Sequence, residues 1–154
     1  ECVSVGLPIG FGDPIFGSLE SDLSKAIFSI PAVKAVEFGS GFEGSKQMGS
    51  KNNDLYIKQN GKVITKTNNA GGILGGLSNG MPLIIRIGFK PAASIARTQN
   101  TIDVSTGSEV ALTVPGRHDP CVVPRAPPVV ESVVTMVLAD HALRGGFIQP
   151  VLKK

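Results

Sequence analysis

The chain has few of the residues on which several large classes of protein depend. It contains no tryptophan, one tyrosine and 5% aromatic residues in total, which leaves few ring surfaces on which single-stranded nucleic acid could stack. Its formal net charge is +3, and its lysines and arginines are scattered rather than gathered into a run, so we expect no nucleic-acid partner. The modest positive charge is better suited to a small anionic ligand.

Cysteines and long apolar runs are also scarce. The two cysteines, Cys2 and Cys121, lie far apart and outside any Cys-x-x-Cys motif or Cys/His cluster, which argues against a disulfide framework and against a metal site. This pattern fits a reducing, cytoplasmic location. No stretch reaches the roughly 20 apolar residues that span a bilayer, and none has the features of a signal peptide. We therefore expect a soluble protein with no membrane partner.

The overall composition is typical of one ordinary globular domain. Hydrophobic residues make up 42% and charged residues 18% of the 154 residues, and a chain of this length buries roughly 70% of its unfolded surface. We expect a single domain over residues 1–154. The strand-like sequence begins directly after Glu1, as it would in a chain that starts within a fold.

Two segments have the apolar periodicity of amphipathic helices. The first is predicted over residues 15–30, where Pro31 stops it, and its stripe consists of Ile15, Leu19, Leu23, Ala26, Ile27 and Ile30. The second is predicted over residues 127–145, with Pro at its start and Gly at its end, and its stripe consists of Val130, Val133, Val134, Val137, Leu138 and His141. We expect His141 to be a satisfied or boundary histidine and Asp140 to be a surface charge.

Between these helices the pattern favours strands and loops. Strands are predicted at residues 2–8, 32–42, 83–89, 101–104 and 109–114. We interpret residues 43–66 as a polar excursion that could form a mobile flap. Gln59-Asn60-Gly61 within it is typical of a hairpin turn. The order of elements predicts an α+β fold, with a layered antiparallel or mixed sheet and helices packed on one face.

The strongest chemical pattern is Gly-Arg-His-Asp-Pro-Cys-Val-Val-Pro-Arg-Ala at residues 116–126. Arg117 and Arg125 could hold a phosphate or carboxylate before a helix start, while Asp119 could accept a proton. A second interpretation stays open, in which Arg117 and Asp119 form a salt bridge that only pins the loop. Cys121 is expected to be a small buried packing residue rather than a nucleophile.

Two further segments could approach a ligand. Residues 69–80 are rich in glycine, which would let backbone N–H groups come close to a phosphate or a flat ring, but they match neither the Rossmann nor the P-loop pattern. Tight turns packed against a strand would explain them equally. Residues 90–94, Lys-Pro-Ala-Ala-Ser, follow an apolar strand, and Lys90 could meet a phosphate or simply be solvated.

Taken together and in this order, four segments closely resemble the C-terminal half of chorismate synthases. They are GFGDPIFGSLESDLSKAIFSIPAVKAVEFGSGF at 10–42, NNAGGILGGLSNG at 68–80, KPAASI at 90–95 and GRHDPCVVPRA at 116–126. The resemblance covers nearly the whole chain. It implies half of the family's β-α-β sandwich fold, a single domain over 1–154, and an N-terminal half that this sequence does not contain.

The resemblance also implies an activity. Chorismate synthases are lyases that remove phosphate and a proton from 5-enolpyruvylshikimate 3-phosphate to give chorismate, with reduced FMN required. It further implies NADPH where the enzyme reduces its own flavin, a homotetramer, and a cytoplasmic enzyme of aromatic amino-acid biosynthesis. An alternative function of a different class stays open, namely a flavin-binding or assembly module that retains the fold without catalysis.

Site residues are implied position by position. Asp119 and Arg117 match the family's catalytic carboxylate and the arginine beside the flavin. The residues that match the family's flavin contacts are Ala32, Gly75, Lys90, Pro91, Ala92, Ala93, Ser94 and Arg117. Pro31 stands where many members have Asn, and Ala92 and Ala93 stand where many have hydroxyl side chains, so only main-chain contacts are expected there. The family's further histidine and arginine segments belong to the missing half, and we expect this chain to be inactive alone.

Overall fold

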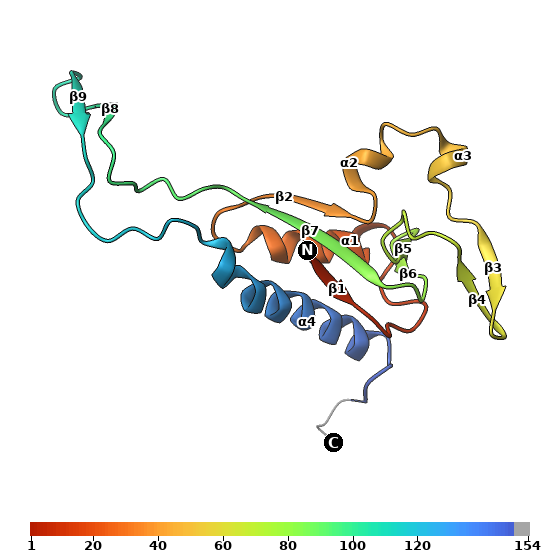
Figure 1. Ribbon diagram of the computed structural model, residues 1–154. Coiled ribbons are helices and arrows are strands. Elements are labelled where there is room, and N and C mark those ends of the chain that lie inside the picture. Colours follow the sequence, from red (N-terminus) through yellow and green to blue (C-terminus); the bar gives the residue numbers. More distant parts are fainter. Residues whose placement is uncertain (150–154) are drawn as a thin grey trace.

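The structure is a computed structural model that describes residues 1–149. The chain follows the element order shown in Figure 1. Its strands are β1 (Cys2–Ser4), β2 (Val33–Phe38), β3 (Tyr56–Gln59), β4 (Lys62–Thr65), β5 (Ile73–Leu74), β6 (Leu77–Ser78), β7 (Leu83–Phe89), β8 (Gln99–Ile102) and β9 (Glu109–Leu112). Its helices are η1 (Ile15–Gly17), α1 (Leu19–Phe28), α2 (Gly41–Gly44), α3 (Gly49–Asn52), η2 (Val123–Arg125) and α4 (Ala126–Arg144).

The centre of the fold is an antiparallel sheet in the order β1-β7-β2. Leu83 and Ile85 of β7 are fully buried, whereas Arg86 between Ile85 and Ile87 is exposed, because successive side chains of a strand point to opposite faces. On the open face, Arg86 pairs with Glu1, which directly precedes β1, and with Glu37 of β2, at 3.0 and 3.3 Å. One face of the sheet is therefore apolar and buried, and the other is open and mixed, with Val3 and Ile84 beside the Arg86–Glu37 pair.

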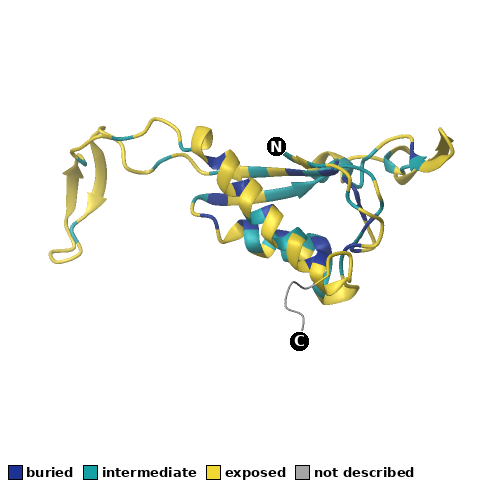
Figure 2. Cartoon of the chain, turned by 90° about the horizontal axis from the view of Figure 1, so that it is seen from below, coloured by how far each residue is buried: buried dark blue, intermediate teal, exposed yellow. Residues whose placement is uncertain are grey.

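The two long helices cover the apolar face. α1 contacts β2 and α4, and α4 contacts β1; Figures 1 and 2 show both helices on the same side of the sheet. The buried helical side chains that share one core cluster with Leu83 and Ile85 of β7 are Leu19, Leu23, Ile27, Val130 and Val134. This arrangement confirms the predicted α+β architecture with helices on one face.

The first helix begins later than its apolar stripe predicted. Ser18 caps α1, because its Oγ accepts a hydrogen bond from the N–H of Ser21 at 3.2 Å. Ile15 lies before this cap in η1, where it has a φ of 67° and is 79% exposed. Its assignment to the buried stripe was wrong. Ile15 has the sequence spacing of the stripe, but the chain is not yet α-helical at that position.

The second helix matches its prediction to within one residue. α4 has Pro127 and Pro128 in its first turn, where the missing N–H groups need no partner. Its predicted apolar stripe is buried or half-buried throughout. No helix within residues 1–149, α4 included, is long and apolar enough to cross a membrane.

The polar excursion and the glycine-rich segment fold into two small hairpins. β3 and β4 join through Asn60 and Gly61, whose φ values of 50° and 79° fit a tight hairpin turn, which confirms the hairpin signal. β5 and β6 join through Gly75 and Gly76. A Cβ on Gly76 would lie 2.7 Å from the Cβ of Ser18, so the turn packs directly against the start of α1.

A long arm leaves the body after β7 and returns before α4. It carries the hairpin of β8 and β9 at its end, away from the sheet and helices (Figures 1 and 2). Strands were predicted at 101–104 and 109–114, and the hydrogen-bonded ladder lies at 99–102 and 109–112 instead. Every residue of both strands is exposed. Neither strand therefore has a buried apolar face from which its ends could be predicted.

Leu23 provides a direct test of the shared core. Leu23→Ala should lower the free energy of unfolding by about 2–5 kcal/mol, because it removes a fully buried side chain between α1 and β7. Lys25→Ala, an exposed change on the same helix, should alter it by less than about 0.5 kcal/mol. Urea denaturation of the purified proteins measures both, and equal effects would contradict the assignment of this helix face to the core.

Candidate functional site

The end of β7 and the start of β2 meet at Ala32. The carbonyl oxygen of Ala32 accepts a hydrogen bond from the N–H of Lys90 at 2.8 Å. Ala32 has a φ of 70°, a left-handed conformation that is uncommon for a residue with a Cβ and is concentrated at functional sites. This contact holds the start of residues 90–94 beside the chain that leaves α1.

Two cations of the predicted site segments, Lys90 and Arg117, have no ion-pair partners in the part of the chain that the structure describes. Lys90 and Arg117 are exposed, and neither forms an ion pair with any of residues 1–149. Ser94 is exposed and Ala92 is half-buried. Unpaired cations suit an anionic group, because charge-assisted hydrogen bonds from Arg and Lys are the strongest that a protein offers to one.

Asp119 pairs with Arg125, whereas the alternative interpretation paired it with Arg117. Nη1 of Arg125 lies 2.9 Å from Oδ2 of Asp119, and Nη2 donates to Oδ1 at 3.4 Å. Arg125 ends η2, so the turn after Pro120 brings it back over Asp119. The pair of Arg117 with Asp119 that the alternative interpretation required is not formed, and Arg117 stays available for a ligand.

The other two side chains of this loop have distinct positions. Nε2 of His118 lies 3.0 Å from the carbonyl oxygen of Val114, so this ring nitrogen closes the loop by donating a hydrogen bond. Cys121 is exposed. Its prediction as a buried packing residue was wrong, because the loop before η2 lies on the surface rather than under the helix.

Gly75 does not lie with the other predicted flavin-contact residues. The N–H of Leu19 donates to Gly76 at the first turn of α1, whereas Ala32 and Lys90 lie beyond its last turn. A ten-residue helix is roughly 15 Å long, so about that distance separates the two groups. The described chain assembles Ala32 and residues 90–94 and leaves Gly75 at the opposite end.

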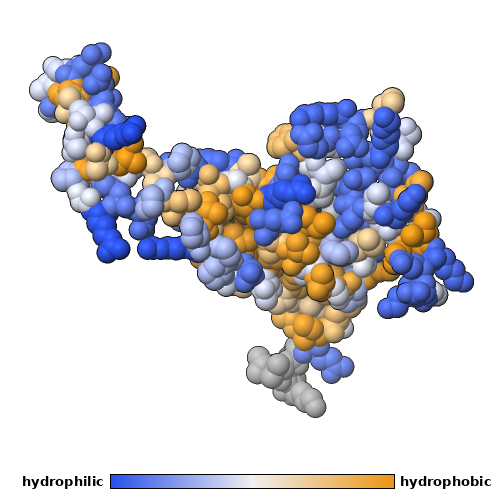
Figure 3. All heavy atoms as spheres, in the orientation of Figure 1, coloured by the Kyte–Doolittle hydropathy of each residue, from blue (hydrophilic) through white to orange (hydrophobic). Residues whose placement is uncertain are grey.

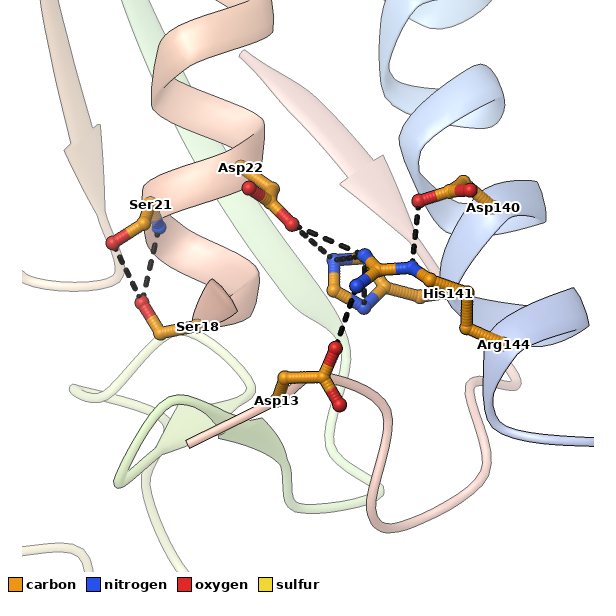
Figure 4. Close-up of polar contacts among 7 residues, drawn as sticks. All are labelled: Asp13, Ser18, Ser21, Asp22, Asp140, His141 and Arg144. Atoms are coloured by element: carbon orange, nitrogen blue, oxygen red, sulfur yellow. Dashed lines mark hydrogen bonds and ion pairs between the residues drawn. The ribbon is translucent and has the colours of Figure 1, made fainter. Parts of the chain in front are cut away.

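The largest cluster of charged side chains joins the two helices, and sequence reasoning missed it. Figure 4 shows the Arg144 guanidinium between three carboxylates, with distances of 2.6 Å to Asp13, 3.2 Å to Asp22 and 2.8 Å to Asp140. Nε2 of the buried His141 lies 3.0 Å from Oδ2 of Asp22. The spacing of Asp140 and Arg144 was the only signal in the sequence, since the other partners are more than 100 residues away.

This cluster is a structural clasp rather than a reaction centre. It ties the end of α4 to α1 and to the loop that holds Asp13. His141 is buried and has a polar partner, which confirms that it is a satisfied histidine. Among residues 1–149, no three His, Cys, Asp or Glu side chains gather as metal ligands would.

Asp54 organises the glycine-rich segment from the side of the excursion. Its carboxylate accepts hydrogen bonds from the Thr67 hydroxyl at 2.6 Å and from the N–H groups of Asn69 and Ala70, each at 2.8 Å. Burial alone would raise the pKa of Asp54, but these three hydrogen bonds together hold it below its ordinary value. Beside it lies an open cavity of about 530 Å³ between the excursion and the glycine-rich segment, lined mostly by neutral polar residues.

The Asp54 contacts predict a pH-dependent contribution to stability. Because the folded-state pKa is lowered, the contribution is present at neutral pH and is lost as the pH falls below about 4 through that pKa. Asp54→Asn should therefore be less stable than the parent at pH 7, and the difference should shrink at acid pH. Thermal unfolding from pH 7 to 3 measures this; Glu109→Gln, at an exposed carboxylate of the arm, should track the parent throughout.

Known proteins similar to this chain agree on one family. The family model described as "Chorismate synthase" matches residues 1–143. A protein named chorismate synthase from Dehalococcoides mccartyi is 53% identical over 154 residues, which are all of this chain and 42% of that protein. One from Methanosarcina mazei is 47% identical over 150 residues, or 97% of this chain and 41% of that protein.

A solved structure gives the same result at the level of the fold. The structure titled "Crystal Structure of Chorismate Synthase" superimposes with a TM-score of 0.72 at 29% sequence identity, over 93% of this chain and 36% of that chain. The chain thus spans about two fifths of the length of the curated relatives it matches.

Proposed function

Because the chain belongs to the chorismate synthase family, we propose that the intact protein removes phosphate and a proton from 5-enolpyruvylshikimate 3-phosphate to give chorismate. The observation that carries this proposal is the loop at residues 116–119. By resemblance its Arg117 and Asp119 match the arginine and the carboxylate of the family's catalytic motif, and Arg117 forms no ion pair among residues 1–149.

The residues at the Lys90 end of the sheet fit the phosphate and polar edge of FMN. Lys90 and Arg117 offer unpaired cations, Ser94 offers a hydroxyl, and Ala32 holds the segment in place through the N–H of Lys90. Bound there in its reduced form, FMN would supply electron density to the eliminating substrate. Gly75 lies about a helix length from Lys90, so the two would not contact the same end of the cofactor.

The chain's own groups account for part of the elimination. A C–H bond must lose its proton to a base while the C–O bond to phosphate breaks and the phosphate leaves. Asp119 is an exposed carboxylate whose pairing with Arg125 fixes its orientation, so it can accept the proton or move it to a neighbouring group. Arg117 and Lys90 can bind anionic oxygens of the substrate or of the cofactor.

The open surface of this half-site indicates what the rest of the protein must provide. All the proposed site residues are exposed except the half-buried Ala32 and Ala92, whereas such chemistry needs a site from which water is excluded. We infer that the remaining three fifths of the polypeptide covers them and adds further substrate contacts. A homotetramer, a cytoplasmic location and NADPH as a flavin reductant belong to the same family-based proposal.

Phosphate release separates the intact enzyme from the isolated chain. With reduced FMN in the absence of oxygen, the intact protein should release phosphate from 5-enolpyruvylshikimate 3-phosphate, and the 154-residue chain alone should not, because its site is half exposed. Turnover by the isolated chain would refute the half-site. Tight FMN binding with no turnover by the intact protein would instead favour a flavin-binding module.

Asp119 can be tested in the same assay. Asp119→Asn in the intact protein should lower kcat by roughly 100-fold or more, because an amide cannot take the proton, while the affinity for FMN should change less than about threefold. Glu43→Gln, at an exposed carboxylate paired with Lys46 on the excursion, is the matched control and should keep the parent's rate. A parental rate in Asp119→Asn would assign Asp119 to holding the loop only.

A further inference from the structure

The open cavity of about 530 Å³ beside Asp54 has no part in the proposed function. Its volume lies within the range of small-molecule sites, roughly 300–1,000 Å³. One wall is the face of the β3–β4 hairpin that carries Tyr56 and Thr65, which lie opposite each other in the ladder. Directly opposed residues of a ladder point to the same side, so both side chains face the cavity. The other walls come from α3 and from the glycine-rich segment.

Thr65 brings an unsatisfied polar atom to this wall. The residue is only 4% exposed, and its hydroxyl oxygen has no hydrogen-bond partner among residues 1–149. Buried hydroxyl groups are nearly always hydrogen-bonded, because an unmet one costs the free energy of its lost hydration. A valine would fill the same space in a strand without that cost. The hydroxyl therefore indicates a polar group that enters the cavity from outside these residues.

Two amide side chains of the lining are left with donors to offer. The Oδ1 atom of Asn79 accepts a hydrogen bond from the N–H of Met81 at 3.0 Å. Because a backbone N–H can only donate, this contact fixes the amide oxygen and leaves the Nδ2 group for a ligand. The Oδ1 atom of Asn52 accepts in the same way from the hydroxyl of Ser40 at 3.1 Å. A ligand that fits here must carry hydrogen-bond acceptors.

The charges around the cavity disfavour an ion of either sign. Within residues 1–149 no lysine, arginine or histidine lines it, and the ionised carboxylate of Asp54 would repel an anion. Both oxygens of that carboxylate already accept hydrogen bonds, from Thr67, Asn69 and Ala70. A cation would therefore meet amide donors and few free acceptors. We expect the ligand to be neutral.

Two apolar side chains complete the lining. Tyr56 and Leu74 both line the cavity and are 62% and 58% exposed. Figure 3 shows a mainly hydrophilic surface around α2 and α3, beside the hydrophobic surface of the sheet. A ring that carries hydroxyl groups suits such a lining, because its hydroxyl groups both donate and accept hydrogen bonds and its C–H faces can pack on an aromatic side chain.

We propose that this cavity binds a neutral cyclic polyol of about the size of a monosaccharide, with hydroxyl groups bonded to Thr65 and Asn79 and one face of its ring against Tyr56. The site is separate in chemistry from the one at Lys90 and Arg117, because the cations there suit an anion and the cavity disfavours one. Binding in the cavity does not rest on the proposed function.

Sugars that share one ring and differ in charge test the class of ligand. The intact protein is titrated with D-glucose, glucosamine and glucose 6-phosphate, and with D-galactose, galactosamine and galactose 6-phosphate, and saturation-transfer NMR at pH 7 follows binding. At least one of the two neutral sugars should bind with a Kd in the millimolar range. Its amino and phosphate derivatives should bind at least roughly threefold more weakly. Absence of binding by both neutral sugars, or tighter binding of a charged derivative, overturns the proposal.

Substitutions in the lining test the location. Thr65→Val removes the hydroxyl at constant shape, so the affinity for the neutral sugar should fall roughly three- to tenfold, while Tm should stay at or above that of the parent because no hydrogen bond within residues 1–149 is lost. Thr65→Ser should restore most of the affinity. Asn79→Asp keeps an acceptor for Met81 and removes the donor, so it should also weaken binding. Thr101→Val, at an exposed hydroxyl of β8, is the matched control, and parental affinity in both cavity variants contradicts the site.

Flavin binding separates this site from the proposed one. Saturating FMN should leave the Kd of the sugar within about twofold, and Thr65→Val should release phosphate at the parent's rate. Displacement of the sugar by FMN would make the cavity part of the flavin site and would overturn the proposal. A parent protein that binds the sugar and releases no phosphate would contradict the proposed function alone.

Discussion

The structure depends on the burial of one face of β7 beneath α1 and α4. Leu83 and Ile85 are fully buried against Leu19, Leu23 and Ile27, and this apolar contact fixes the sheet, both helices and the two ends of β7 at once. The glycine-rich turn is seated at the start of α1, and Ala32 with Lys90 at its other end. The predicted site residues are therefore divided between two ends of one packed unit.

Polar contacts fix the positions of the elements around this apolar core. The Arg144 clasp fixes the end of α4 against α1 and the Asp13 loop, and Asp54 fixes the glycine-rich segment against the excursion. Lys90 and Arg117 are exposed and form no ion pair among residues 1–149, but the same is true of Lys58, Lys62 and Lys66 on the excursion. The resemblance to the family's motifs, rather than the lack of a partner, therefore distinguishes Lys90 and Arg117.

Several local features could be predicted because their causes are local. The Asn60-Gly61 hairpin, the end of α1 before Pro31 and the limits of α4 all follow from residues within a few positions of one another. Ile15 and Cys121 were placed wrongly because a periodic or apolar residue is buried only where another element covers it. The sequence also left the partner of Asp119 open, and a turn after Pro120 brings Arg125 to it rather than the nearer Arg117.

The sequence by itself determined the family, the two helices, the one-sided sheet and the loop that carries Arg117 and Asp119, because these depend on short motifs and on apolar periodicity. Only the tertiary structure decided that Gly75 lies a helix length from Lys90, that Arg144 joins residues more than 100 positions apart, and that residues 95–114 form an ordered arm outside the body. These are relations between distant segments, and they are set by how the layers pack rather than by any local pattern of residues.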